Sequence, residues 1–222
     1  MNIENKPQII EHINYCLDNT IYDLKWVHGK SNIIAVGEML DKKGYIHIYN
    51  LDRGKFTCIS KTNLDKGVKT IAPFFSSTGT YTIACGSFDG NILLYDINNM
   101  SEEYYKIRKH TKLINKIDCK NYKNNNIIVS ASRDGSVKIF DIRTKQELGV
   151  YKYVYPEKNS IFDEKIGCKK GIVGELNKLN DLNVSTQPII SFDWCKDKLG
   201  LSVMASLDQT IKIYIITKLN LY

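Results

Sequence analysis

One short pattern, at residues 130–141, constrains the fold of this chain more than any other. Its centre is Asp134 and Gly135, a pair that signals a hairpin because both residues tolerate the backbone angles of a tight two-residue loop. Short runs rich in β-branched and aromatic residues flank this pair, at 127–129 and at 137–140. The pattern therefore predicts a strand, a turn and a second strand.

The same pattern recurs three more times, at residues 35–50, 84–96 and 205–214. An aromatic residue closes each copy: Tyr49, Tyr95, Phe140 and Tyr214. The first two intervals between these aromatics are 46 and 45 residues, which matches the period of about 40–45 residues of four-stranded propeller blades. The third interval is 74 residues, so something extra or something missing lies there. The spacing predicts an all-β fold of four-stranded antiparallel blades.

These copies resemble the repeats of the WD-repeat β-propeller family, and the resemblance covers nearly the whole chain. In that family a loop His, a strand Ser or Thr, the turn Asp and an aromatic residue, usually Trp, form a hydrogen-bonded tetrad inside each blade. The resemblance assigns these places in the third copy to His110, Ser130, Asp134 and Phe140. Because Phe lacks an indole N–H donor, we expect an incomplete network and blades that depend more on apolar packing. The turn and blade-closing residues of the other copies are Asp89, Gly90, Tyr95, Asp208, Tyr214 and Tyr49.

The resemblance implies one propeller domain over residues 1–222. Its expected blades are residues 20–62, 67–108, 113–153 and 187–220, with a strand at 7–13 that completes the last blade and an irregular loop at 154–186. A loop of about 30 residues is uncommon in a compact domain, so this loop is either functional or disordered. Trp26 and Trp194 occupy equivalent places in the first and last blades, and we interpret both as core anchors.

The composition is that of an ordinary globular protein, with 43% hydrophobic and 25% charged residues. No run of about 18 apolar residues exists, which excludes a transmembrane helix, and the N-terminus lacks a signal-peptide pattern. We therefore expect a cytoplasmic protein without a membrane partner. The net charge is +7, but 27 of the 31 basic residues are Lys. Bidentate recognition of nucleic acid favours Arg, so we expect no nucleic-acid partner.

Residues that could carry chemistry are scattered along the chain. The six cysteines contain no CxxC pair and no His at metal-ligand spacing, and the four histidines form no HExxH motif. There is no G-x-S-x-G elbow. Residues 29–31 imitate only the end of a P-loop, because Leu24 stands where the first Gly must be. We expect no enzyme activity, no metal, no cofactor and no small-molecule substrate.

Several stretches outside the repeat consensus resemble the Monad-like branch of the WD-repeat family, whose members are cofactors for assembling axonemal dyneins. These stretches are residues 6–10, 23–27, 132–138, 151–156, 185–189, 192–194, 197–201, 208–210 and 216–220. The resemblance implies a non-enzymatic co-chaperone adaptor for building a cilium or flagellum. The implied partners are a prefoldin-like co-chaperone complex and RuvB-like ATPases, with dynein chains as clients.

The chain departs from that branch in the number of blades. Monad-like proteins form seven blades, whereas four copies of the pattern occur here. Residues 148–153 resemble the end of the branch's sixth blade, yet they directly follow the third copy, so a join would lie near 145–147. The absence of about three blades is either a real deletion or a missed exon. Two alternative readings stay open: a generic WD-repeat adaptor, such as a substrate receptor of a ubiquitin ligase, and a truncated product of a longer gene.

Four blades must either tilt steeply to close a ring or leave the ring open. We expect the strand at residues 8–13 to pair with the strand at 211–216, because that pairing would cover a bare sheet edge. We also expect a small or strained ring, with residues 154–186 bulging outside. An open arc would instead expose apolar faces on its first and last blades.

Overall fold

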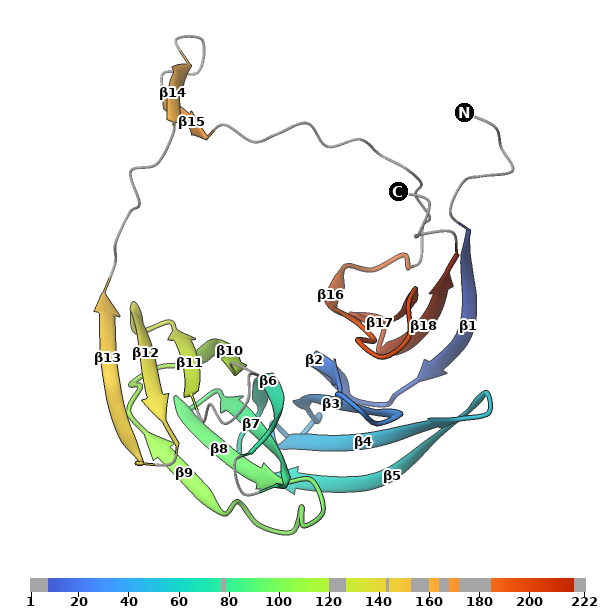
Figure 1. The fold of residues 1–222 in the computed structure, drawn as a ribbon, viewed down its shortest axis with the longest axis horizontal. Helices are drawn as coiled ribbons and strands as arrows, with labels where there is room; N and C mark the ends of the chain where they lie inside the picture. The colour runs from blue at the N-terminus through green and yellow to red at the C-terminus, as the bar shows by residue number, and fades with distance from the viewer. Residues whose placement is uncertain are drawn as a thin grey trace.

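The computed structural model describes residues 8–76, 79–119, 127–142, 144–152, 160–163, 168–171 and 185–217. Within these ranges the chain forms four four-stranded antiparallel sheets and one hairpin, and it forms no helix (Figure 1). The described part of the chain accordingly has no helix that could span a bilayer. The predicted all-β fold is confirmed.

Each four-stranded sheet is one blade. The first blade contains β2 (Thr20–Trp26), β3 (Asn32–Glu38), β4 (Gly44–Asp52) and β5 (Lys55–Leu64). The second contains β6 (Val68–Phe75), β7 (Tyr81–Ser87), β8 (Asn91–Asp96) and β9 (Tyr105–Arg108). The third contains β10 (Ile114–Cys119), β11 (Ile127–Ser132), β12 (Ser136–Asp141) and β13 (Gln146–Lys152). The fourth contains β16 (Ile189–Trp194), β17 (Leu201–Ser206), β18 (Thr210–Ile216) and β1 (Ile9–Cys16).

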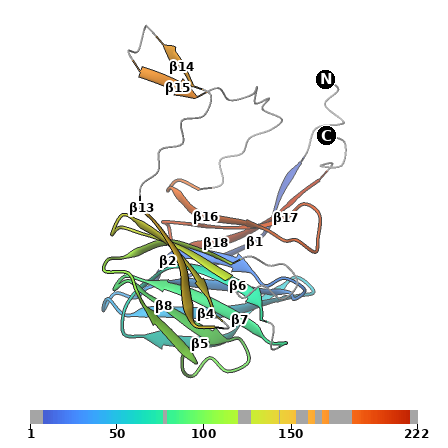
Figure 2. The same ribbon diagram turned by 60° about the vertical axis from the view of Figure 1, so that its left-hand side comes forward.

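The N-terminal strand completes the fourth blade, as predicted. β1 pairs with β18 in antiparallel register, and the two strands lie side by side in both ribbon views (Figures 1 and 2). The hydroxyl of Tyr214 on β18 donates a hydrogen bond of 3.0 Å to Glu11 Oε2 on β1. Burial, together with the adjacent Glu11 carboxylate, raises the pKa of Tyr214 to about 12, so the hydroxyl keeps its proton and donates. The first and last strands of the described part of the chain are thereby held in one sheet.

The hairpin at Asp134 and Gly135 forms, but its loop is one residue longer than predicted. β11 ends at Ser132 and β12 begins at Ser136, so three residues connect them. Gly135 donates its N–H to the Ser132 carbonyl at 3.2 Å and has a φ of 82°. A turn that ends in a left-handed residue requires this third position, and glycine occupies it without strain.

Consecutive blades pack face to face around an arc, in the order fourth, first, second, third (Figure 1). The inner strands β16, β2, β6 and β10 contact one another in that order. A buried apolar cluster fills each contact: Leu24 and Val203 belong to the cluster between the first and fourth blades, and Leu94 and Ile128 to the cluster between the second and third. A third cluster joins the first and second blades. The core is therefore divided among the blade contacts.

The arc is open between the third and fourth blades. Their strands do not pack against each other, among the described residues, in the way that the other neighbouring blades do, and Figure 1 shows the two sheets at opposite ends of the arc. The expectation of a small or strained ring is therefore wrong. A four-bladed ring would need roughly 90° between neighbouring blades, the widest angle in the range of known propellers, and the blade contacts of this chain leave its third and fourth blades apart.

Two further expectations are corrected. Trp26 is buried between the first and fourth blades, as expected of a core anchor, but Trp194 is 42% exposed. The reason is that the fourth blade packs over the face of the first blade that carries Trp26, while no described blade packs over the face of the fourth blade that carries Trp194. Within the loop expected at 154–186, β14 (Ser160–Asp163) pairs with β15 (Cys168–Gly171), so this part is a hairpin rather than irregular. The rest of that loop up to residue 184, and the expected blade ends at 153 and 220, lie outside the described residues.

Candidate functional site

His110 lies between β9 and β10 and bridges two parts of the third blade. Its Nδ1 is 2.8 Å from Asp134 Oδ2, and its Nε2 is 2.7 Å from the Ser130 hydroxyl. Because a carboxylate only accepts, Nδ1 carries the proton and Nε2 accepts from Ser130. Phe140 is buried on the same face of the sheet, in the neighbouring strand. The four tetrad positions thus lie together, and Phe140 contributes packing without a hydrogen bond.

Asp134 is the main acceptor of this network. The backbone N–H and the hydroxyl of Ser136 donate to Oδ1 at 2.9 and 2.6 Å, and the Thr111 N–H donates to Oδ2 at 3.1 Å. Burial alone would raise the pKa of Asp134, but the hydrogen bonds from Ser136, His110 and Thr111 outweigh burial and hold the pKa well below its ordinary value. These contacts hold the turn in place and support a structural role for the group.

The fourth blade contains a shortened version of the same network. Backbone hydrogen bonds between the hairpin and the start of the inner strand align the blades. In this alignment Asp208 corresponds to Asp134, and Ser185 corresponds to His110. The Ser185 hydroxyl donates to Asp208 Oδ2 at 2.7 Å. Sequence reasoning missed Ser185, although Ser185 and His110 both stand four residues before the inner strand of their blade.

The second blade keeps the Asp-Gly turn at Asp89 and Gly90, but in the described part of the chain Asp89 makes no hydrogen bond to a residue outside that turn. Asp89 accepts a hydrogen bond from the Ser87 hydroxyl and one of 3.2 Å from the Asn91 N–H, both within its own turn. Gly90 follows with a φ of 84°, and a Cβ at this position would lie 2.7 Å from the His110 carbonyl oxygen. Only glycine therefore fits between this turn and the next blade.

The places of His and Ser in the second blade are taken by less polar side chains. By the same alignment, Leu64 stands where the third blade has His110, and Cys85 stands where it has Ser130. Both side chains pack in the apolar cluster between the first and second blades. The aromatic residues that close the other three copies are all buried: Tyr49, Tyr95 and Tyr214. Packing thus replaces the tetrad there.

A second network, which sequence reasoning missed, joins all four blades at the inner edge of the arc. Asp23 on β2 is buried and accepts from Ser191 of β16 at 2.7 Å, Thr70 of β6 at 3.0 Å and Lys116 of β10 at 3.0 Å. These four residues are equivalent, because each one follows the register shift in its inner strand. The signal available in the sequence was a polar residue at the same place of every inner strand.

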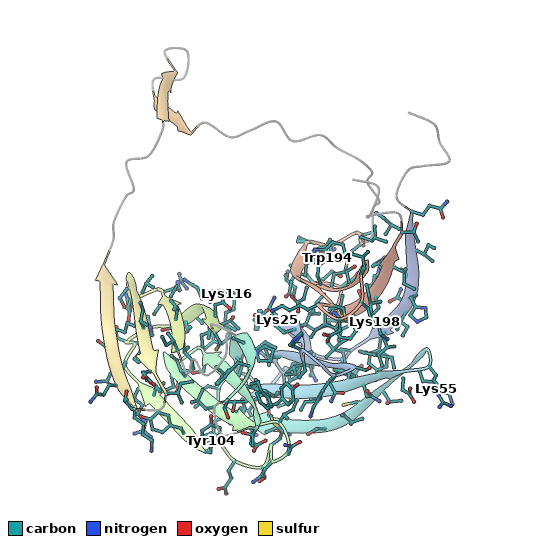
Figure 3. The ribbon with its side chains drawn as sticks, viewed as in Figure 1. Lys25, Lys55, Tyr104, Lys116, Trp194 and Lys198 are labelled. Carbon is teal, nitrogen blue, oxygen red and sulfur yellow. The ribbon has the colours of Figure 1, made fainter. Side chains whose placement is uncertain are left out.

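A cavity of about 290 Å³ opens beside the Asp23 network, where the four inner strands end. Residues of all four blades line it, including Lys25, Lys116, Trp194 and Lys196. Figure 3 shows Lys25, Lys116 and Trp194 on the inner side of the arc, whereas Lys55 and Tyr104 lie on its outer side. The cavity is therefore a place where one ligand could contact every blade.

Residues with charges of both signs line this cavity, and polar contacts link the first blade to the fourth beside it. Lys25 Nζ lies 3.4 Å from Asp193 Oδ1, and His28 Nδ1 lies 3.2 Å from Asp197 Oδ1. The indole N–H of Trp26 is buried and has no acceptor in the described part of the chain, although buried polar groups are normally hydrogen-bonded. Such mixed walls suit a polypeptide segment better than a single anion or cation.

The described residues include histidines, carboxylates and free cysteines. Within the described ranges, no three His, Cys, Asp or Glu residues gather in a way that could hold a metal ion. Burial raises the pKa of the Cys85 and Cys119 thiols well above the ordinary range, so both stay protonated and unreactive at neutral pH.

Similarities to known proteins follow the blade pattern. The family model described as "WD domain, G-beta repeat" matches residues 56–96 and 101–141. Each match begins near the outer strand of one blade and ends with the third strand of the next, β8 or β12. This offset explains why the N-terminal strand is needed to complete the fourth blade.

Several relatives with one name resemble the chain over nearly its whole length. Dynein axonemal assembly factor 10 of Chlamydomonas reinhardtii is 20% identical over 357 aligned positions, covering 99% of this chain and 99% of that protein. The protein of the same name from Homo sapiens is 21% identical over 356 positions, with the same coverage. A WD repeat-containing protein 55 homolog from Dictyostelium discoideum is 34% identical over 107 residues, which cover 48% of this chain and 24% of that protein.

The alignments also explain the number of blades. An alignment of 357 positions exceeds the 222 residues of this chain by 135, so at least that many positions have no residue of this chain opposite them. At about 40–45 residues per blade, the difference corresponds to about three blades. The described residues thus form a partial β-propeller of four blades, residues 56–96 and 101–141 match the WD-repeat model, and over nearly its whole length the chain is similar to dynein axonemal assembly factor 10.

Proposed function

We propose that this chain is a non-enzymatic adaptor that holds other proteins during the cytoplasmic pre-assembly of axonemal dynein arms. The observation that supports this most is its similarity to dynein axonemal assembly factor 10 of two distant organisms, over 99% of the chain in each case. Resemblance to Monad-like proteins suggests the partners: a prefoldin-like co-chaperone complex and RuvB-like ATPases, with dynein chains as clients.

The cavity at the inner edge is the surface that we assign to a partner segment. It combines lysines, carboxylates and two tryptophans over about 290 Å³. Tryptophan side chains in partly buried sites are typical anchors of protein interfaces. Because all four blades line the cavity, binding there would also depend on the arc being intact.

Affinity purification of the tagged chain from cells that build flagella tests this proposal. We expect RuvB-like ATPases or prefoldin-like subunits among the recovered proteins. Lys196→Glu reverses a charge at the exposed rim of the cavity, so it should reduce recovery several-fold. Lys55→Glu makes the same change on the outer side of the arc (Figure 3) and should leave recovery unchanged.

The outcomes separate the alternatives. Recovery of cullin-type ligase components in place of the expected partners would favour a general substrate receptor. Recovery of the expected partners with equal yield from Lys196→Glu would place their contact away from the cavity. Circular dichroism of both variants checks that each keeps the strand content of the parent.

A further inference from the structure

Each end of the arc presents one sheet face, on the fourth blade and on the third blade. These two faces resemble the two surfaces that meet wherever consecutive blades of this chain pack together. In every contact between blades of this chain, one face of a blade packs on the preceding blade and the opposite face packs on the following blade. We call these the leading face and the trailing face. In the described part of the chain, the fourth blade has a leading face with no blade before it. The third blade likewise has a trailing face with no blade after it.

The leading face of the fourth blade is marked by Phe192 and Trp194 on β16. Phe192 occupies the position that Leu24, Ile71 and Ile117 hold in the other inner strands. Those three side chains are at most 1% exposed because a preceding blade covers each of them, whereas Phe192 is 40% exposed. The rings of Phe192 and Trp194 meet edge to face, with centroids 5.1 Å apart. An aromatic pair therefore stands where a preceding blade would pack.

The trailing face of the third blade is marked by Val137 and Ile139 on β12, with Ala131 beside them on β11. In the second blade the matching residues, Ile92 and Leu94, are buried against the third blade. Val137 is 36% exposed and Ile139 is half-buried. The side chains at these positions are apolar in both blades, but only those of the second blade are covered by a following blade.

We propose that a second copy of this chain covers both faces, so that two arcs close a single eight-bladed ring. The trailing face of each third blade would pack on the leading face of the partner's fourth blade. This arrangement makes two identical contacts about a two-fold axis, which is the commonest symmetry of homo-oligomers. Eight blades lie within the range of known propellers and need about 45° between neighbouring blades, half of what a four-bladed ring would need.

A second copy fits better than an unrelated partner because it supplies both missing halves at once. The contact it would form already occurs three times inside the chain. At one of these, a Cβ built on Gly86 would lie 3.0 Å from Ile117 Cδ1, so these two positions face each other. By the alignment of the blades, the matching positions in the new contact are Ala131 and Phe192.

The connection between the third and fourth blades does not prevent this arrangement. It runs from Lys152 to Ile189, and an extended chain spans about 3.3 Å per residue. Even with the β14–β15 hairpin folded, that reach is sufficient to pass along one face of the ring, past the four partner blades that would lie between the third and fourth blades of one chain. An uncovered pair of apolar faces would otherwise remain in water, which is unusual for a monomeric protein.

Sedimentation equilibrium of the whole chain tests the proposal. The wild-type protein should have twice the chain mass of 25.5 kDa. Ala131→Lys and Phe192→Glu should each give the monomer mass, because in a homodimer either change alters both contacts. An equimolar mixture of the two variants should regain the dimer mass. In that mixed dimer one contact pairs the new lysine with the new glutamate, and the other contact is unchanged.

Leu40→Glu is the matched control. Leu40 is 91% exposed in the loop between β3 and β4, away from both faces, and its variant should stay dimeric. Regain of the dimer on mixing also shows that both variants fold. A monomeric wild-type chain would overturn the proposal. So would a dimer that only Phe192→Glu dissociates, since the fourth blade would then pair with itself. Two variants that both stay dimeric, or that do not recover on mixing, would equally contradict it.

Discussion

The second and third blades are consecutive copies of one pattern, yet different interactions stabilise them. In the second blade the central strands β7 and β8 are buried on both faces, and Cys85 stands in the core. In the third blade β11 is fully buried only at every second residue, and Asp134, His110 and Ser130 are linked by hydrogen bonds. The tetrad residues are thus present in a blade that has a described neighbour on one side only. The comparison teaches that a polar network supports a hairpin where packing is one-sided.

The relative sizes of the two effects follow from general magnitudes. Full burial of a large aliphatic side chain contributes about 1.5–3 kcal/mol. A neutral hydrogen bond contributes about 0.5–1.5 kcal/mol net, and one to a charged group about 1.5–3 kcal/mol. We therefore expect truncation of apolar residues to affect the second blade most, and loss of hydrogen bonds to affect the third blade most.

The largest difference should appear at Leu94 and Ile139, which occupy the same place in β8 and β12. Leu94 is fully buried, so Leu94→Ala should lower the free energy of unfolding by about 2–5 kcal/mol. Ile139 is half-buried on the trailing face of the third blade, so Ile139→Ala should lower the free energy of unfolding by only about 1 kcal/mol. Urea unfolding in a Phe192→Glu background, which keeps the chain monomeric, measures both. Equal losses would show that the third blade is covered on both sides.

Loss of the turn carboxylate should lower the stability of the third blade more than that of the second. Asp134→Ala leaves His110, Thr111 and Ser136 without their acceptor and should cost about 1–3 kcal/mol. Asp89→Ala removes hydrogen bonds inside one turn only and should cost less than about 1 kcal/mol. Thermal melts of the two variants compare them directly. An Asp134→Ala protein that melts like its parent would show that the network contributes nothing.

Acid should affect the same two carboxylates unequally. Burial alone would raise the pKa of Asp134 and of Asp89, but hydrogen bonds outweigh burial in both. The net pKa of each carboxyl group lies below the ordinary value of 3.8, and that of Asp134 is lowered more. A carboxyl group whose pKa is lower in the folded state stabilises that state above about pH 4. This contribution is lost as the pH falls further toward the folded pKa. The Asp134→Asn protein should therefore lose less stability than its parent between about pH 4 and pH 2, and Asp89→Asn should change this loss less.

The smallest effect concerns the closing aromatics. Phe140→Trp places an indole N–H near Ser130, as in the usual tetrad, so the stability should change by less than about 1 kcal/mol. Tyr95→Trp makes a similar change in the second blade, where Cys85 offers only a weak acceptor. Overpacking at that fully buried position should cost about 1–3 kcal/mol. A lower urea midpoint for Phe140→Trp than for Tyr95→Trp would argue against a hydrogen bond between the new indole and Ser130.

Local patterns predicted the elements of this fold well. The turn at Asp134 and Gly135 and the aromatic spacing were sufficient to predict the strands and the blades, because these depend on residues close in the sequence. The closing strand pairs with residues about 200 positions away, and it was predicted from the family resemblance. The added loop residue was not predicted, since the two-residue and three-residue turns share the same Asp-Gly signal. Likewise, the exposure of Trp194 depends on a neighbouring blade, which its own sequence does not report.

The networks were only partly predictable. Asp134, His110 and Ser130 could be assigned because a family resemblance exists for them. The role of Asp23 could not, because its partners Ser191 and Lys116 come from blades far away in the chain. The angle between blades could not be predicted either, because it depends on how side chains of two sheets interdigitate.

The two tryptophans give the most direct test that a blade precedes the first blade but not the fourth. Each is observed alone by replacing the other with Phe, in an Ala131→Lys background that keeps the chain monomeric. Trp26 should emit at short wavelength and resist acrylamide, because it is buried between two blades. Trp194, 42% exposed, should emit at longer wavelength and be quenched several-fold more strongly. Equal protection of both tryptophans would show that a single chain covers the leading face of its fourth blade, and would contradict the open arc.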